Sequence, residues 1–277
     1  MDTIQTQVQQ EWQERSLAIC TTVQTALRQD RLFFAFQPVV CATSGKVDYF
    51  ECLLRMRSVE GSIVSGGEFI TSIEQLGLIG FIDDFALDQT VQELASHPGI
   101  RLGLNVSSLT ACDGAWLRSL ISLLRWQPDL ARRLVVEITE TAALSDIGET
   151  ARFVDRLRDA GCRVALDDFG AGHTSPRQLQ ILAVDTVKVD GSLVRNLAGS
   201  TEKRDALRDL LGLINGFGFA TVAEGVENAD DAAAVRAEGF AYLQGYHLGP
   251  PTLHRSWLAT AASETPHCLA SHTIAAV

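Results

Sequence analysis

Residues 162–172 read CRVALDDFGAG, and the rest of the chain can be interpreted from this stretch. An apolar run typical of a buried strand ends in two adjacent aspartates, Asp167 and Asp168, and a glycine-containing turn follows directly. Two neighbouring carboxylates repel one another, and they lose hydration when they lie against a core. A chain retains such a pair where water or a cation offsets that cost. Taken alone, the pair fits a solvated loop and a cation site equally well.

Outward from this stretch, strand-like and helix-like segments alternate along the chain. Strands separated by helices of 10–15 residues indicate parallel βα units. About eight strands in roughly 220 residues favour a (β/α)8 barrel over an open sheet. Strands are expected at 33–40, 46–55, 101–106, 134–139, 162–167, 186–190, 220–223 and 241–243, and helices at 68–76, 82–95, 115–126, 146–160, 175–182, 202–217 and 229–238.

The start of this pattern departs from an ideal barrel. Only a short turn containing Thr43, Ser44 and Gly45 separates the first two strands, whereas a parallel crossover needs a dozen or more residues. We therefore expect a hairpin there. We divide the chain into an N-terminal helix or linker (1–30), a barrel domain (31–252) and a C-terminal helix and tail (253–277).

Composition limits the partners and the compartment. The 34 acidic residues outnumber the 23 Lys and Arg residues, giving a formal net charge of -11 that disfavours binding to a nucleic-acid polymer or an anionic membrane. The six cysteines form no C-x-x-C pair, which fits reduced core residues of a cytosolic protein. The polar N-terminus does not resemble a signal peptide, and no apolar run approaches the roughly 18 residues of a membrane span. We expect a cytoplasmic protein without direct membrane insertion.

Polar residues occur where the predicted strands meet their following loops, and the C-terminal ends of parallel barrel strands are where active sites form. A single acid at a strand end is usually a helix cap. Capping is a poor explanation, however, when such residues occur at the ends of five or more strands. Carboxylates and one amide, without His or Cys, select hard cations such as Mg²⁺, Mn²⁺ or Ca²⁺. The residues are Glu51, Asn105, Glu137, Glu140, Asp167, Asp168, Lys188, Asp190, Glu224 and Glu227.

So many acids exceed the needs of one ion, and two ions about 4 Å apart suit in-line displacement at phosphorus. Because successive strand residues face opposite ways, Asp167 and Asp168 can serve both ions only if the strand ends at Asp168, and the Phe169-Gly170 that follows indicates that it does. Lys188 could orient or deprotonate a water, or could be a structural counter-ion. Arg55 shares a strand face with Glu51, which suits phosphate binding near the ions.

The motifs, in their order and spacing, resemble the bacterial EAL domain, a cyclic di-GMP-specific phosphodiesterase family. The resemblance covers roughly residues 32–251. It is carried by Gln37-Pro38, ECLLR (51–55), Asn105, EITE (137–140), DDFG (167–170), KVD (188–190), AEGVE (223–227) and QGY (244–246).

The resemblance implies a modified (β/α)8 TIM-type barrel with an antiparallel first strand. It also implies hydrolysis of cyclic di-GMP to linear pGpG with Mg²⁺ or Mn²⁺, two ions per site, and inhibition by Ca²⁺. Glu51, Asn105, Glu137 and Asp167 would hold one ion, and Asp167 and Asp168 the second, with Glu224 near it. Lys188 and Gln244 would position the attacking water, Arg55 and Gln37 would contact substrate, Glu140 would anchor the loop after Asp168, and Glu227 would support the rim.

The implied partners are cyclic di-GMP and a second copy of the chain, bound through the loop and helix after Asp168. An upstream sensor or GGDEF domain is implied if the chain is a fragment. The sequence departs from the family at Cys52, where Ala is usual, and in the loop at Ala171, His173 and Pro176. We expect Cys52 to point away from the metals and the loop to work with altered regulation.

Two alternatives remain beside the phosphodiesterase. A catalytically silent member would bind cyclic di-GMP or a protein and signal by shape, but such members usually lack a metal carboxylate, Lys188 or Glu224. An enolase-like barrel also combines carboxylate-bound Mg²⁺ with a lysine base. That class would not predict Glu51 and Arg55 on the first hairpin.

Overall fold

The strands of this chain form one sheet that closes on itself, as the computed structural model shows for the residues it describes, 2–170 and 175–258. The order is β1-β9-β8-β7-β6-β5-β4-β2, and β1 also pairs with β2, which closes an eight-stranded barrel. The strands are β1 (Leu32–Cys41), β2 (Val47–Arg57), β4 (Leu102–Val106), β5 (Leu134–Thr139), β6 (Arg163–Phe169), β7 (Thr186–Val189), β8 (Ala220–Ala223) and β9 (Tyr242–Leu243).

The first strand runs against the rest of the ring. β1 pairs antiparallel with both β2 and β9, while the other neighbouring pairs of the ring are parallel. The expected antiparallel first strand is confirmed. The reason is local, because the turn from β1 to β2 is too short for a crossover. A short strand that we did not predict, β3 (Ile63–Ser65), adds to the outer edge of β2.

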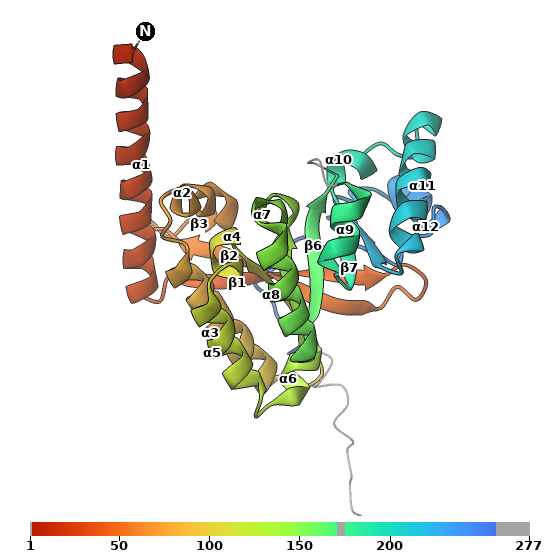
Figure 1. The fold of residues 1–277 in the computed structure, drawn as a ribbon, viewed down its shortest axis with the longest axis horizontal. Helices are drawn as coiled ribbons and strands as arrows, with labels where there is room; N and C mark the ends of the chain where they lie inside the picture. The colour runs from red at the N-terminus through yellow and green to blue at the C-terminus, as the bar shows by residue number, and fades with distance from the viewer. Residues whose placement is uncertain (1, 171–174, 259–277) are drawn as a thin grey trace, which may run out of the picture.

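Helices cover the outside of the barrel (Figure 1). The helices predicted within 68–238 are present, the expected 68–76 as the short α2, whereas α4, α6, α7 and α10 were not predicted, since segments this short usually carry too little periodicity. The helices are α1 (Asp2–Arg28), α2 (Ile70–Gln75), α3 (Gly80–Ser96), α4 (Ser108–Ala111), α5 (Gly114–Leu124), α6 (Pro128–Arg133), α7 (Glu140–Ser145), α8 (Ile147–Asp159), α9 (Pro176–Leu182), α10 (Gly191–Val194), α11 (Thr201–Gly216) and α12 (Ala229–Ala237), with a 3-10 turn at Gly66–Glu68.

Two apolar layers hold the barrel. The larger lies between the sheet and its helices and includes Leu104, Leu120 and Leu166, each at most 1% exposed. The smaller lies inside the barrel and contains Val39, Tyr49, Val135, Ala165 and Val222. The inner layer matters for function, because it forms the floor beneath the polar residues at the barrel mouth.

The ends of the chain add to this frame. Part of α1 packs on the domain through the buried Cys20, Val23 and Ala26, while its beginning extends away from the barrel (Figure 1). Near the other end, Trp257 packs against Phe36 and Phe50, with ring centroids 4.9 and 4.8 Å apart. Most of the predicted C-terminal helix and tail, 259–277, lies outside the described residues. Within the described chain, every helix is too short or too polar to span a bilayer.

We predict opposite effects from two Gly→Ala substitutions. Gly245 has φ +155°, and an added Cβ would lie 2.2 Å from the Val226 carbonyl oxygen, so Gly245→Ala should lower the free energy of unfolding by about 1–3 kcal/mol. Gly212 lies on the exposed face of α11 with nothing within 4 Å of such a Cβ. Gly212→Ala should therefore raise the free energy of unfolding by about 0.5–1 kcal/mol. Urea unfolding of both variants checks the pair, and equal shifts would contradict the close backbone packing at Gly245.

Candidate active site

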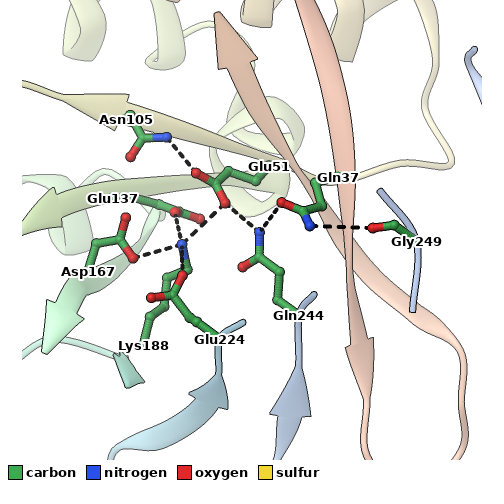
Figure 2. Close-up of polar contacts among 9 residues, drawn as sticks. All are labelled: Gln37, Glu51, Asn105, Glu137, Asp167, Lys188, Glu224, Gln244 and Gly249. Atoms are coloured by element: carbon green, nitrogen blue, oxygen red, sulfur yellow. Dashed lines mark hydrogen bonds and ion pairs between the residues drawn. The ribbon is translucent and has the colours of Figure 1, made fainter. Parts of the chain in front are cut away.

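One polar side chain from each strand of the closed ring, or from the residue directly after it, lies at the mouth of the barrel (Figure 2). Strand register explains the convergence, since Gln37 lies opposite Glu51 and Asn105 lies beside Glu137. Glu51, Glu137 and Asp167 each come two positions after a residue of the inner layer (Tyr49, Val135 and Ala165), so each faces the same side of the sheet one step further along its strand. The set is Gln37, Glu51, Asn105, Glu137, Asp167, Lys188, Glu224 and Gln244.

Lys188 lies at the centre of this set and is 0% exposed. Its Nζ lies 2.7 Å from Glu137 Oε2, 2.8 Å from Asp167 Oδ1, 3.0 Å from Glu224 Oε1 and 3.3 Å from Glu51 Oε2. Four carboxylates, three on different strands and Glu224 directly after a fourth, therefore share one ammonium group. This arrangement leaves the cluster with excess negative charge.

The pKa values reflect this crowding. Burial alone would lower the pKa of Lys188, but the surrounding carboxylates raise it well above its usual value, so Lys188 is a cation at neutral pH. Burial raises the pKa of Glu137 to about 8, although Lys188 opposes the rise. Burial and the charge of Asp167 likewise raise the pKa of Glu224 well above its usual value. One ammonium does not compensate all these acids, so the cluster retains protons.

Glu51 connects the cluster to a chain of amides. Asn105 Nδ2 donates to Glu51 Oε1 at 2.8 Å, and Gln244 Nε2 donates to Glu51 Oε2. Burial alone would raise the pKa of Glu51, but Lys188 and these two amides together lower it. Gln244 also donates to Gln37 Oε1, whose own amide donates to the Gly249 carbonyl. Gln37 is 9% exposed, and its amide is occupied by these bonds.

Asp167 and Asp168 point into one site for a reason that we did not predict. We expected the strand to end at Asp168, but it continues to Phe169. Its pairing with β7 shifts between Leu166 and Phe169, and Asp168 has φ 57°. Asp adopts this left-handed backbone conformation more readily than most residues do. The conformation turns the carboxylates of Asp167 and Asp168 to the same side.

Two overlapping groups of carboxylates fit divalent cations. Oxygens of Glu51, Glu137 and Asp167 lie within 4.8 Å of one another, and so do oxygens of Asp167, Asp168 and Glu224. Asp167 belongs to both groups and could bridge two ions. An all-oxygen donor set with excess negative charge fits Mg²⁺ or Mn²⁺ and does not fit a structural zinc site.

A cavity of about 490 Å³ opens from this cluster. Glu51, Asn105 and Asp168 line one part of it, and Arg55 lines its wall. The Arg55 guanidinium donates to the Leu54 carbonyl at 2.8 Å and is partly buried, which lowers its pKa. A cation beside a carboxylate cluster can hold an anionic group of a substrate against bound metal ions.

The two residues expected to support the site lie at its border. Glu140 is 2% exposed and its Oε2 accepts from the Gly170 backbone N–H at 3.1 Å, at the base of the loop after Asp168. Glu227 forms an exposed ion pair with Arg195 at 3.2 Å. The loop residues Ala171 and His173 lie outside the described residues, while Pro176 is the first residue of α9 and Ser175 caps that helix. Cys52 is 3% exposed, and it packs among the sheet–helix core residues.

One supporting contact was missed from the sequence. The buried Asp83 of α3 accepts from Ser107 Oγ at 2.6 Å, two residues beyond Asn105, and so fixes the end of β4. Burial raises the pKa of Asp83, although its bonds to Ser107 oppose the rise. An acid inside an otherwise apolar helix face was the available signal, because such a residue needs a buried partner.

Comparison with known proteins agrees with this geometry. The family model described as EAL domain matches residues 21–251. The chain belongs to the EAL-domain family. Cyclic di-GMP phosphodiesterase PdeF of Escherichia coli strain K12 is 30% identical over 239 residues, which are 85% of this chain and 32% of that protein. Cyclic di-GMP phosphodiesterase NbdA of Pseudomonas aeruginosa is 28% identical over 231 residues, 82% of this chain and 30% of that protein. The chain thus spans about a third of the length of these curated relatives.

Solved EAL-domain structures share the fold. The FimX EAL domain of Pseudomonas aeruginosa, bound to c-di-GMP, superposes with a TM-score of 0.78 at 27% identity, covering 84% of this chain and 96% of that one. The PaMucR phosphodiesterase in its c-di-GMP complex gives a TM-score of 0.77 at 26% identity, covering 87% and 99%. The expected TIM-type barrel of the EAL family is confirmed.

We predict that, without added divalent cation, stability falls as the pH rises from about 5 to 8. Folding raises the pKa of Glu137 to about 8, and that of Asp168 to about 6 through burial and the charge of Asp167. The folded chain therefore holds protons that the unfolded chain has lost, and raising the pH through this range favours unfolding. Thermal unfolding with chelator at pH 5 and pH 8 measures the effect.

Added Mg²⁺ should reduce this loss, because the cation replaces the protons. Asp168→Asn is the matched variant and should weaken the pH dependence only in part, since solvent screens some of the charge at the exposed rim. If the midpoint of thermal unfolding in the presence of chelator is higher at pH 8 than at pH 5, the raised pKa values assigned to Glu137 and Asp168 are contradicted.

Proposed function

We propose that this chain is a metal-dependent cyclic di-GMP phosphodiesterase that hydrolyses one phosphodiester bond to give linear pGpG, and thereby lowers the level of a second messenger. The observation that carries the proposal is the cluster of Glu51, Glu137, Asp167, Asp168 and Glu224, arranged in two groups that share Asp167. The names of the relatives and the c-di-GMP complexes of similar EAL domains support the choice of substrate.

The metal-holding roles follow the two groups. Glu51, Glu137 and Asp167 would hold one Mg²⁺ or Mn²⁺ together with Asn105, which is bonded to Glu51, and Asp167 and Asp168 would hold the second, with Glu224 beside it. When bound, the two cations supply the positive charge that activates a water and stabilises negative charge on the phosphate oxygens. We propose that Ca²⁺ inhibits, since it takes more ligands at longer distances than Mg²⁺.

Lys188 and Gln244 orient the attacking water. Because its pKa is raised, Lys188 keeps its proton and acts as a hydrogen-bond donor. The hydrogen bond from Gln244 Nε2 to Glu51 holds the amide of Gln244 in one orientation. We assign Gln37 to holding Gln244, since its amide contacts Gln244 and Gly249; a direct contact of Gln37 with substrate stays a prediction from the sequence.

Arg55 binds a phosphate of the substrate from the cavity wall, beside the acid cluster. Glu140 anchors the base of the loop after Asp168 through Gly170, and Glu227 supports the rim through Arg195. We further propose a homodimer through that loop and α9, whose Ile181 is 45% exposed. A cytoplasmic location and an upstream sensor or GGDEF domain complete the proposal.

The decisive experiment incubates the purified chain with cyclic di-GMP and Mg²⁺ or Mn²⁺ and separates the nucleotides by chromatography. We expect pGpG with either ion, none with chelator, and inhibition by Ca²⁺. Equilibrium dialysis of the nucleotide runs in parallel. Binding of cyclic di-GMP without conversion would contradict the enzymatic function and favour a catalytically silent cyclic di-GMP receptor. The absence of both binding and conversion would favour a protein-interaction module.

Lys188→Met separates water positioning from metal binding. The substitution removes the ammonium from four carboxylates, so hydrolysis should fall by about 10²-fold or more, as for loss of a positioned proton donor. Thermal stabilisation by Mn²⁺ should persist or increase, because the cation then meets less opposing charge.

Glu137→Gln is the matched comparison for Lys188→Met, since both residues are fully buried and in contact. It should reduce both hydrolysis and stabilisation by Mn²⁺, because it removes a ligand. A Lys188→Met variant that keeps full activity would refute the proposed role of Lys188.

A further inference from the structure

Tyr49 lies directly beneath the acid cluster and has no role in the proposal above. It belongs to β2, two residues before Glu51, and its side chain is 3% exposed within the inner layer of the barrel. A tyrosine adds a polar hydroxyl to a layer whose other buried members are Val39, Val135, Ala165 and Val222. A buried hydroxyl needs a hydrogen-bond partner, so its position calls for a physical reason.

Gly103 makes room for this ring. It lies on β4 beside Glu51 in the register of the sheet. A Cβ at position 103 would lie 2.5 Å from Glu137 Oε1 and 2.9 Å from Tyr49 Cε2. The carboxylate of Glu137 and the edge of the Tyr49 ring therefore meet in the space that any larger residue at 103 would fill.

Two polar atoms at this meeting point lack partners. Neither Tyr49 Oη nor Glu137 Oε1 has a hydrogen bond within the described part of the chain, and both are buried. The other oxygen of Glu137, Oε2, accepts from Lys188. A phenol donates one hydrogen bond and a carboxylate oxygen accepts, so the two unpaired atoms are chemically complementary.

A charged side chain also packs on the face of the ring. The guanidinium of Arg163 lies over it, 5.8 Å from the ring centroid, and Arg163 Nη2 is held by Asp48 Oδ2 at 2.9 Å. Burial and the neighbouring Glu137 charge raise the pKa of Tyr49 well above its usual value, so the phenol keeps its proton. It is therefore a neutral donor that adds no charge to an already acidic cluster.

We propose that Tyr49 is a positioning residue of the metal site: its hydroxyl donates to Glu137 Oε1, directly or through one water, and keeps Oε2 turned toward Lys188 and the cations. The inference rests on the proposed metal-dependent function. Partners that orient a metal ligand in this way typically contribute 10–100-fold to metal affinity.

The test is Tyr49→Phe, which removes the hydroxyl and keeps the ring that packs against Gly103. Calorimetric titration with Mn²⁺, without nucleotide, should show about 10–100-fold weaker binding than in the unaltered chain. The KM for cyclic di-GMP at saturating Mn²⁺ should stay within about twofold, because the hydroxyl does not reach substrate, and the unfolding midpoint with chelator should not fall.

Tyr242→Phe is the matched control, since Tyr242 packs on the same inner layer from β9. It should bind Mn²⁺ as the unaltered chain does. Equal weakening in both variants, or Mn²⁺ affinity of Tyr49→Phe within twofold of the unaltered chain, would overturn the positioning role and leave the proposed function intact. An unaltered chain that does not bind Mn²⁺ would overturn the metal-dependent function, and this inference with it.

Discussion

The ammonium of Lys188 among four buried carboxylates is the interaction on which the site depends. Glu51, Glu137 and Asp167 lie on three strands and Glu224 directly after a fourth, and each has a carboxylate oxygen within 3.3 Å of the same nitrogen. Acids this close would repel one another strongly in a buried site, so a cation must hold them together. One positive charge is too little, which is why the pKa values of Glu137 and Glu224 rise. The same deficit of positive charge means that the cluster could hold divalent ions.

A closed barrel is suited to such a cluster, because its strands bring eight side chains from distant parts of the chain to one mouth. The apolar layer below, with Val135, Ala165 and Val222, excludes water from beneath the acids and makes their charges interact more strongly. Tyr49 and Gly103 modify this floor at one point: the missing side chain of Gly103 leaves the space that the Tyr49 ring fills next to Glu137. The floor is therefore part of the site and tunes the residues above it.

Long, periodic segments were predictable, and short or irregular ones were not. The alternation of strands and helices led to the barrel, and the short turn at Gly45 led to the hairpin and its antiparallel first strand. The pattern could not reveal α7 or β3, because elements of a few residues show no period. It also placed the end of β6 wrongly, since a shift in pairing with β7, which the sequence of β6 does not contain, turns Asp168 toward Asp167.

The sequence by itself determined which chemical groups are available: carboxylates, an amide, a lysine and an arginine at strand ends, in the order of the EAL family, predict a site for a hard cation and an anionic substrate. Residue type and spacing suffice for this, because they are local properties of the chain. Only the tertiary structure decided which groups meet. It joined Lys188 to four acids, tied Gln37 to Gln244, buried Asp83 against Ser107 and set Tyr49 beside Glu137. These contacts depend on strand stagger and packing across the barrel, which no single stretch of sequence encodes.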